Sequence, residues 1–70
     1  MIDEKVSNIK VFRIQKGKNQ EEMAKIGKMS KPTYIDKEKK RVKFNTDEIK
    51  EYKKYFDLSY EEAWFLFFED

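Results

Sequence analysis

Residues 19–38 read NQEEMAKIGKMSKPTYIDKE and predict two short helices joined by a tight turn. Asn19 is placed to cap the first helix, with Glu22 three residues later bonding back to the cap backbone. Apolar residues then recur at helical spacing. Gly27 is a stop signal, because glycine accepts the left-handed conformation that ends helices.

The second half of this segment predicts a new helix. Ser30 is its expected cap, and Pro32 fits the first turn, where the N–H that proline lacks is not needed. A helix, a short turn and a second helix form the outline of a helix-turn-helix. In such a motif the residues that enter the second helix, here Lys31 to Thr33, would point at a duplex groove.

The rest of the chain predicts three further helices. The first runs over about residues 8–16. The fourth is capped by Asn45 or Thr46, and the fifth is opened by a capping-box pattern at Ser59 and Glu62. We therefore expect one all-α domain of five helices over residues 1–70, with a loose lead-in over 1–7 and an aromatic helix over 59–70. Within the lead-in, Ile2 and Val6 are expected to contact the core, and the strand-like residues 42–44 are expected to form a loop.

Charge is distributed unevenly along the chain. The formal net charge is only +2, yet residues 31–43 hold six basic and two acidic residues, and residues 44–70 hold three basic and eight acidic ones. Positive charge therefore gathers in and just after the expected second helix of the turn motif. Such a patch suits contact with phosphates. A solvated lysine-rich loop is the alternative interpretation.

The residue types make an enzyme or a metal protein unexpected. The chain has no Cys and no His, so thiolate ligands, imidazole ligands and the commonest general base are absent. No nucleophile–base pair and no glycine-rich phosphate loop is recognisable. We therefore expect no enzymatic activity, no cofactor and no metal.

No membrane or export signal is recognisable in the sequence. Residues 1–8 are polar and lack the apolar segment of a signal peptide. The longest apolar run, residues 63–68, is far too short to cross a bilayer. The sequence therefore predicts a soluble, cytoplasmic protein without a membrane partner.

The last helix is apolar on all sides, which is too much for one face of a surface helix. A core this small cannot bury every aromatic ring, so one subset should pack inside and the rest should form a patch of the kind that marks an interface. We expect a homodimer through this helix, with a patch for a different protein as the alternative. The candidate interface residues are Trp64, Phe65, Phe67 and Phe68.

This layout resembles the lambda-repressor-like helix-turn-helix family, the xenobiotic-response-element group that includes phage Cro and C1 repressors. The resemblance covers about residues 8–68. It is carried by Ile9, Phe12 and Arg13, by the QEEMA segment at 20–24, by Ser30, Thr33, Tyr34 and Glu38, and by the LSYEE segment at 58–62. The family implies a small phage- or prophage-type transcriptional regulator that binds double-stranded DNA as a dimer.

The resemblance also implies residue roles. Gln20 would hydrogen-bond a phosphate at a helix N-terminus, with Ser30 as a further contact, and the recognition helix over 31–38 would enter the major groove. Lys31, Pro32 and Asp36 occupy base-facing positions, whereas Thr33 would bond a phosphate or a base. Asp36 alternatively pairs with Lys39 or Lys40 one turn on. The expected backbone contacts are Lys39, Lys40, Arg41 and Lys43, and Arg13 and Glu38 match a partly buried salt bridge of the family.

The sequence departs from the family pattern at several positions. Gly27 stands where the turn usually has an apolar residue, and Lys28 stands where it usually has glycine. Lys37 takes an apolar position of the recognition helix, and Lys40 takes the place of a glycine. These departures motivate a second hypothesis, in which a repurposed helix-turn-helix binds another protein as an inhibitor or adaptor.

Overall fold

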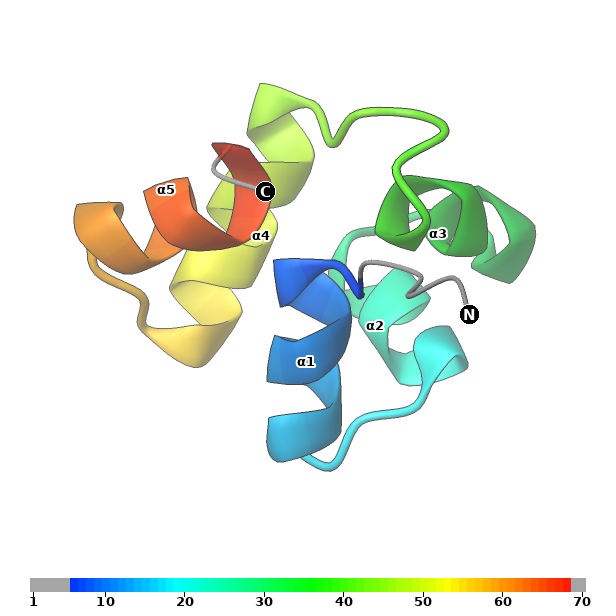
Figure 1. Ribbon diagram of the computed structural model, residues 1–70, viewed down its shortest axis with the longest axis horizontal. Coiled ribbons are helices and arrows are strands. Elements are labelled where there is room, and N and C mark those ends of the chain that lie inside the picture. The colour runs from blue at the N-terminus through cyan, green and yellow to red at the C-terminus, as the bar shows by residue number, and fades with distance from the viewer. Residues whose placement is uncertain (1–5, 69–70) are drawn as a thin grey trace, which may run out of the picture.

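The computed structural model describes residues 6–68, and over these residues the chain is entirely helical, without strands. The helices are α1 (Asn8–Gln15), α2 (Gln20–Ile26), α3 (Lys31–Glu38), α4 (Thr46–Phe56) and α5 (Tyr60–Phe68) (Figure 1). The prediction of an all-α chain with five helices is confirmed for this part of the sequence. The expected contact of Ile2 and the last two residues of the 59–70 helix lie outside the described residues.

Side-chain caps start the helices where the sequence predicts. Asn19 and Asn45 each accept a hydrogen bond from the backbone of a glutamate three residues on, and that glutamate bonds back in a complete capping box. Asn45, and not Thr46, is therefore the cap of α4. The expectation of a loose lead-in up to residue 7 is wrong at its end. Ser7 is buried and caps α1 by accepting from the Lys10 amide at 3.3 Å.

The turn between α2 and α3 is built differently from the prediction. Gly27 has φ −81°, and the left-handed residue is Lys28, with φ 60°. Glycine is required at position 27 for space, because a Cβ there would overlap the Tyr52 hydroxyl and the Met29 methyl group. Lys40 is also left-handed, with φ 67°, so Lys28 and Lys40 both adopt a backbone conformation that glycine favours.

The core is small and rich in aromatic rings. Its buried cluster consists of Ile9, Met23, Ala24, Tyr34 and Tyr52. The Tyr52 hydroxyl donates to the Met23 carbonyl at 2.8 Å, so α4 is tied to the last turn of α2. Among residues 6–68, every helix is too short or too polar to cross a bilayer.

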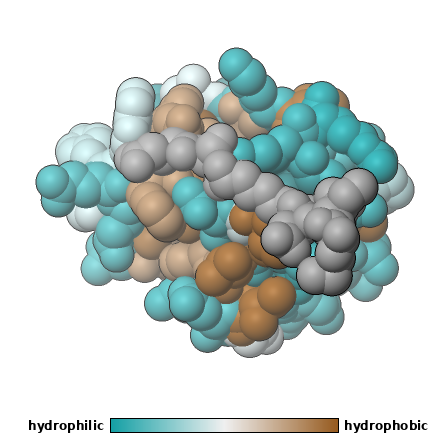
Figure 2. All heavy atoms as spheres, in the orientation of Figure 1, coloured by the Kyte–Doolittle hydropathy of each residue, from teal (hydrophilic) through white to brown (hydrophobic). Residues whose placement is uncertain are grey.

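Helices α3 and α5 lie at opposite ends of the long axis. In Figure 1, α3 lies at one end, packed on α2, and α5 lies at the other end, beside α1 and α4. The connection over residues 39–45 runs from α3 to α4 along one edge. In the same view, Figure 2 shows brown side chains at the lower centre, where α1 lies, and its exposed apolar residues include Val11 and Ile14. Exposed apolar side chains of α1 thus lie between the α3 end and the α5 end of the molecule.

Candidate nucleic-acid interface

The first turn of α3 is capped by a side chain and is exposed to solvent. The Ser30 hydroxyl accepts from the Thr33 amide at 3.4 Å and donates to the Thr33 hydroxyl at 2.9 Å. Ser30 therefore acts as the cap that the sequence predicts. Lys31, Pro32 and Thr33 are all exposed around this cap, so the first turn of α3 presents three predicted contact residues to solvent.

Two charged side chains are buried on the inner face of α3. Tyr34 is fully buried, and Lys37 and Glu38 are 8% and 3% exposed. Positions 34, 37 and 38 share one helical face, whereas Asp36 lies three residues after Thr33 on the outer side. The helix thus faces the core with ionisable groups, each of which needs a partner.

Glu38 is the centre of a buried hydrogen-bond network that joins three helices. Its carboxylate accepts from Arg13 Nε of α1 at 2.7 Å, from the Tyr34 hydroxyl at 2.7 Å and from Gln20 Nε2 of α2 at 3.1 Å. Burial alone would raise the pKa of Glu38, but the hydrogen bonds from Arg13, Tyr34 and Gln20 hold it below its ordinary value. Burial also raises the pKa of Tyr34. The network therefore keeps Glu38 charged and fixes the C-terminal end of α3 against α1 and α2.

Gln20, the predicted phosphate contact, is positioned by this same network. A side-chain amide carries two N–H groups, and the bond to Glu38 uses one of them. Among residues 6–68 the second N–H has no hydrogen-bond acceptor. Gln20 is half-buried and is the first residue of α2, where the helix dipole favours an anion.

Lys37, on the inner face of α3, forms a second ion pair. Its ammonium donates to both oxygens of Glu48 at 2.5 and 2.6 Å. Glu48 also accepts from the Asn45 amide at 2.9 Å, so the same carboxylate caps α4 and binds α3. The departure at position 37 is thus accommodated by a charged partner, and α3 remains a regular helix.

The basic residues after α3 remain at the surface. Lys39, Lys40, Arg41 and Lys43 are all exposed. The Arg41 guanidinium lies 3.3 Å from Asp36, and both side chains are largely solvated. The sequence offers Lys39 or Lys40 as a partner of Asp36, and the structure places Arg41, three residues after the end of α3, against this carboxylate. Such an exposed pair contributes little stability.

The fold brings several of these residues to one surface hollow of about 430 Å³. Gln20, Lys39, Lys40 and Arg41 line it together with Lys10 of α1 and with Glu38, whose carboxylate is paired with Arg13. Sequence reasoning missed Lys10, because only the packing of α1 beside the end of α3 distinguishes it from the other lysines of the N-terminal third. Four cations around a half-buried amide make this hollow suitable for phosphate oxygens. The predicted Lys43 lies outside it, on the other side of the 39–45 connection.

The aromatic candidates on α5 separate into two groups. Trp64, Phe65 and Phe68 are more than half exposed, and the Trp64 and Phe68 rings lie 5.0 Å apart. The inclusion of Phe67 in the interface set is wrong. Its ring stacks on Tyr52 at 5.7 Å and meets Phe44 at 5.0 Å, so it completes the core.

Sequence reasoning also missed apolar residues next to this patch. Tyr60, at the start of α5, is 83% exposed. Val11 and Phe65 line a shallow groove between α1 and α5. Helical spacing predicts that Val11 lies off the core face of α1. It does not predict that Phe65 of α5 lies across the groove from it.

Residues 6–68 contain no cluster of three or more acidic side chains that would hold a metal ion. Comparison of the chain with protein-family models, with curated proteins and with solved structures finds no significant match. The interpretation of this surface therefore depends on its own geometry and charge.

Proposed function

We propose that the protein is a small DNA-binding regulator of transcription with a lambda-repressor-like helix-turn-helix fold, of the phage or prophage type. In this proposal α2 and α3 form the helix-turn-helix and α3 enters the major groove of double-stranded DNA. The observation that carries the proposal is the joint placement of the open first turn of α3 and the basic hollow beside its other end. One part would face bases, and the other would hold the backbone.

The roles of individual residues follow from their positions. Lys31, Pro32 and Thr33 would meet base edges or the adjacent phosphate. Gln20, with its second amide N–H, would bind a phosphate oxygen. The surrounding backbone contacts would be Lys10, Lys39, Lys40, Arg41 and Lys43, and Asp36 would meet a cytosine amine only after releasing Arg41.

The test is the salt dependence of binding to random-sequence duplex DNA, measured by fluorescence anisotropy. Each neutralised phosphate contributes about −0.9 to the slope of log affinity against log salt. Replacing both Lys31 and Arg41 by Ala should weaken binding and make the slope shallower, by about 0.9 if only Arg41 binds a phosphate and by about 1.8 if Lys31 does so too. The matched control replaces Lys50 and Lys54, two exposed lysines of α4, and removes the same charge. Absence of binding at low salt, or equal effects of the two double variants, would refute the proposal.

We further propose that the protein acts as a homodimer through the exposed aromatic face of α5. Two copies related by a two-fold axis would present two α3 helices to half-sites about 34 Å apart. The exposed rings of Trp64, Phe65 and Phe68 support this role, because apolar groups of this size are usually covered by a partner.

A second candidate function is favoured by the same aromatic face. This face belongs to α5, which lies at the end of the molecule opposite α3 and carries the acidic residues Glu61 and Glu62 in its first turn. A repurposed helix-turn-helix that binds another protein would bind it through α5, and α3 would contact no DNA. Affinity capture from nuclease-treated lysate separates the two. Stoichiometric recovery of one protein by the wild type, lost when Trp64 and Phe68 become Ser, would favour the protein-binding function. Nuclease-sensitive recovery would favour DNA.

A further inference from the structure

The shallow groove between α1 and α5 has a volume of about 480 Å³, and DNA contact through α3 does not use it. Phe12 and Leu66 form its floor. Both belong to the packed interior, since Leu66 is buried and the Phe12 ring meets Phe56 edge-on at 4.9 Å. Val11 and Phe65, which also line the groove, are 43% and 51% exposed. The groove therefore presents apolar side chains to water above a packed apolar floor.

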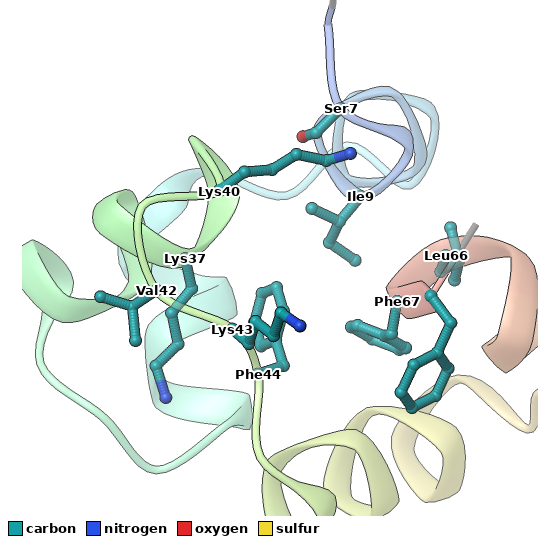
Figure 3. Close-up of a pocket in the computed structure, with 10 residues that line it drawn as sticks. Ser7, Ile9, Lys37, Lys40, Val42, Lys43, Phe44, Leu66 and Phe67 are labelled. Atoms are coloured by element: carbon teal, nitrogen blue, oxygen red, sulfur yellow. The ribbon is translucent and has the colours of Figure 1, made fainter. Parts of the chain in front are cut away.

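Contacts between α1 and α5 hold the two walls of this groove in place. The Asn8 side chain, at the start of α1, donates to the Phe65 carbonyl at 2.9 Å. Figure 3 shows Ile9 of α1 and Phe67 of α5 directed into one hollow beside the 39–45 connection, where both join the core. The spacing of α1 and α5 is thus set by the fold itself, and a ligand would find the groove already formed.

The groove is acidic toward the start of α5. Glu61 and Glu62 both line it and are exposed, and none of its described lining residues is basic. Hydrogen bonds from Ser59 lower the pKa of Glu62, and the charge of Lys16 adds to this effect. Among residues 6–68 the Glu61 carboxylate forms no ion pair. A ligand in the groove therefore meets negative charge next to the apolar surface.

These features select the chemistry of an occupant. A nucleic acid would bring phosphates to the two carboxylates and be repelled. A second copy placed groove to groove would bury the glutamates of both copies without a cation from either lining. An extended peptide would find no sheet edge among residues 6–68, where all regular structure is helical. An amphipathic helix with basic residues beside its apolar stripe suits both the apolar floor and the acidic end.

We propose that the groove between α1 and α5 is a docking site for a cationic amphipathic helix of a different protein. A large apolar side chain of that helix would lie between Val11 and Phe65, and a lysine or arginine beside it would pair with Glu61. The inference deepens the second candidate function, protein binding through α5, and rests on it. It needs neither DNA binding nor the homodimer.

The direct test uses a fluorescein-labelled helical model peptide of leucine and lysine, with the leucines at helical spacing along one face. Its matched counterpart has glutamate in place of every lysine. Anisotropy titrations without DNA measure the affinity of both peptides. We expect saturable one-to-one binding of the lysine peptide and about tenfold weaker binding of the glutamate peptide, because charges of the same sign then meet at the acidic end.

Two pairs of matched variants test the two parts of the groove. Glu61→Lys should lower the affinity for the lysine peptide about tenfold, whereas Glu21→Lys, which also changes an exposed second residue of a helix, should leave it unchanged. Val11→Ala should lower this affinity about fivefold, because apolar contact with the peptide is lost. Val42→Ala truncates another exposed valine, outside this groove, and should have no effect.

Amide chemical shifts locate the bound peptide. Changes at Val11, Gln15 and Phe65 support the groove. Changes confined to Trp64 and Phe68 would overturn it, because neither residue lines the groove. Equal affinity of the two peptides, or equal effects within either pair of variants, would also overturn the proposal.

Two further outcomes separate this proposal from the functions on which it borders. Self-association that Val11→Ala weakens and Val42→Ala does not would identify a second copy as the occupant and overturn the proposal. A lysate protein that is captured equally by the wild type, Glu61→Lys and Val11→Ala would overturn the groove and retain the protein-binding function. Capture of no protein would refute the protein-binding function, whereas the peptide titrations would still decide the groove.

Discussion

Helices α3 and α5 have similar lengths, eight and nine residues, yet they meet the rest of the protein through different contacts. Besides the buried Tyr34 ring, α3 is held by buried charges, through Glu38 to α1 and α2 and through Lys37 to α4. α5 is held mainly by apolar contacts of Ala63, Leu66 and Phe67. Directional polar bonds fix the orientation of α3, which a helix that reads a groove requires.

The exposed faces of α3 and α5 also carry different chemical groups. α3 and the following connection present hydroxyl, ammonium and guanidinium groups, whereas α5 presents aromatic rings beside Glu61 and Glu62. Phosphates suit the first surface, and an apolar protein surface suits the second. The contrast therefore predicts that substitutions at one end leave the function of the other end intact.

The largest expected effect comes from removing the charge that anchors α3. Replacing Arg13 by Met leaves Glu38 buried without a cation, and we expect a loss of about 3–5 kcal/mol in the free energy of unfolding. Urea denaturation measures it. Lys28→Met is the control, because Lys28 forms an exposed pair with Glu51 and should cost less than about 1 kcal/mol. An unchanged melting temperature for Arg13→Met would contradict the anchoring role.

A pH titration of stability compares the two ends directly. The pKa of Glu38 is lowered by its hydrogen bonds despite burial, and the pKa of Glu62 is lowered by backbone and side-chain hydrogen bonds from Ser59. A depressed folded-state pKa contributes stability that is present above the unfolded carboxyl value of 4.5 and is lost as pH falls below it. We expect the buried Glu38 to dominate. Glu38→Gln should flatten the acid loss of stability more than Glu62→Gln, and the reverse order would contradict this assignment.

At the α5 end, replacing Trp64 and Phe68 by Ser should weaken the proposed dimer by about tenfold or more, because the apolar area buried between copies is lost. Sedimentation equilibrium should then report the chain mass of 8.6 kDa. Val42→Ser removes an exposed apolar side chain from the 39–45 connection and should leave the dimer unchanged. A wild-type protein that is monomeric at all concentrations would contradict the dimer.

The smallest expected effect concerns the backbone of the turn before α3. Lys28 has a positive φ, so Lys28→Gly should relieve steric strain and stabilise the fold by up to about 1 kcal/mol. Lys25→Gly, inside α2, should destabilise it by about 1 kcal/mol. Thermal melts of the two variants should therefore shift in opposite directions, and shifts of the same sign would contradict the assigned turn.

The sequence predicts the helices of this protein well because their start signals are local. The capping pairs Asn19–Glu22 and Ser59–Glu62 depend on residues three apart, and the bonds form as expected. The partner of Lys37 was not predictable in this way, since Glu48 lies on another helix. The inward position of Phe67 likewise depends on where α4 places Tyr52.

The candidate site was predicted in part for the same reason. Lys31 to Thr33 follow directly from the cap at Ser30, which the local sequence reveals. The hollow that joins Gln20 and Arg41 to Lys10 is made by packing three separate segments, and no spacing in the sequence encodes it. The pairing of Arg41 with Asp36 was also missed, since helical spacing favours partners within the helix.

The two ends of the molecule are distinguished most directly by an NMR titration of isotopically labelled protein with random-sequence duplex DNA at low salt. We predict that DNA changes the amide chemical shifts of residues 30–43 and of residues around Gln20, at the start of α2. The amide shifts of the exposed residues of α5 should not change through contact with DNA. Shifts concentrated at Trp64, Phe65 and Phe68, or no shifts at all, would contradict the claim that the α3 end binds nucleic acid.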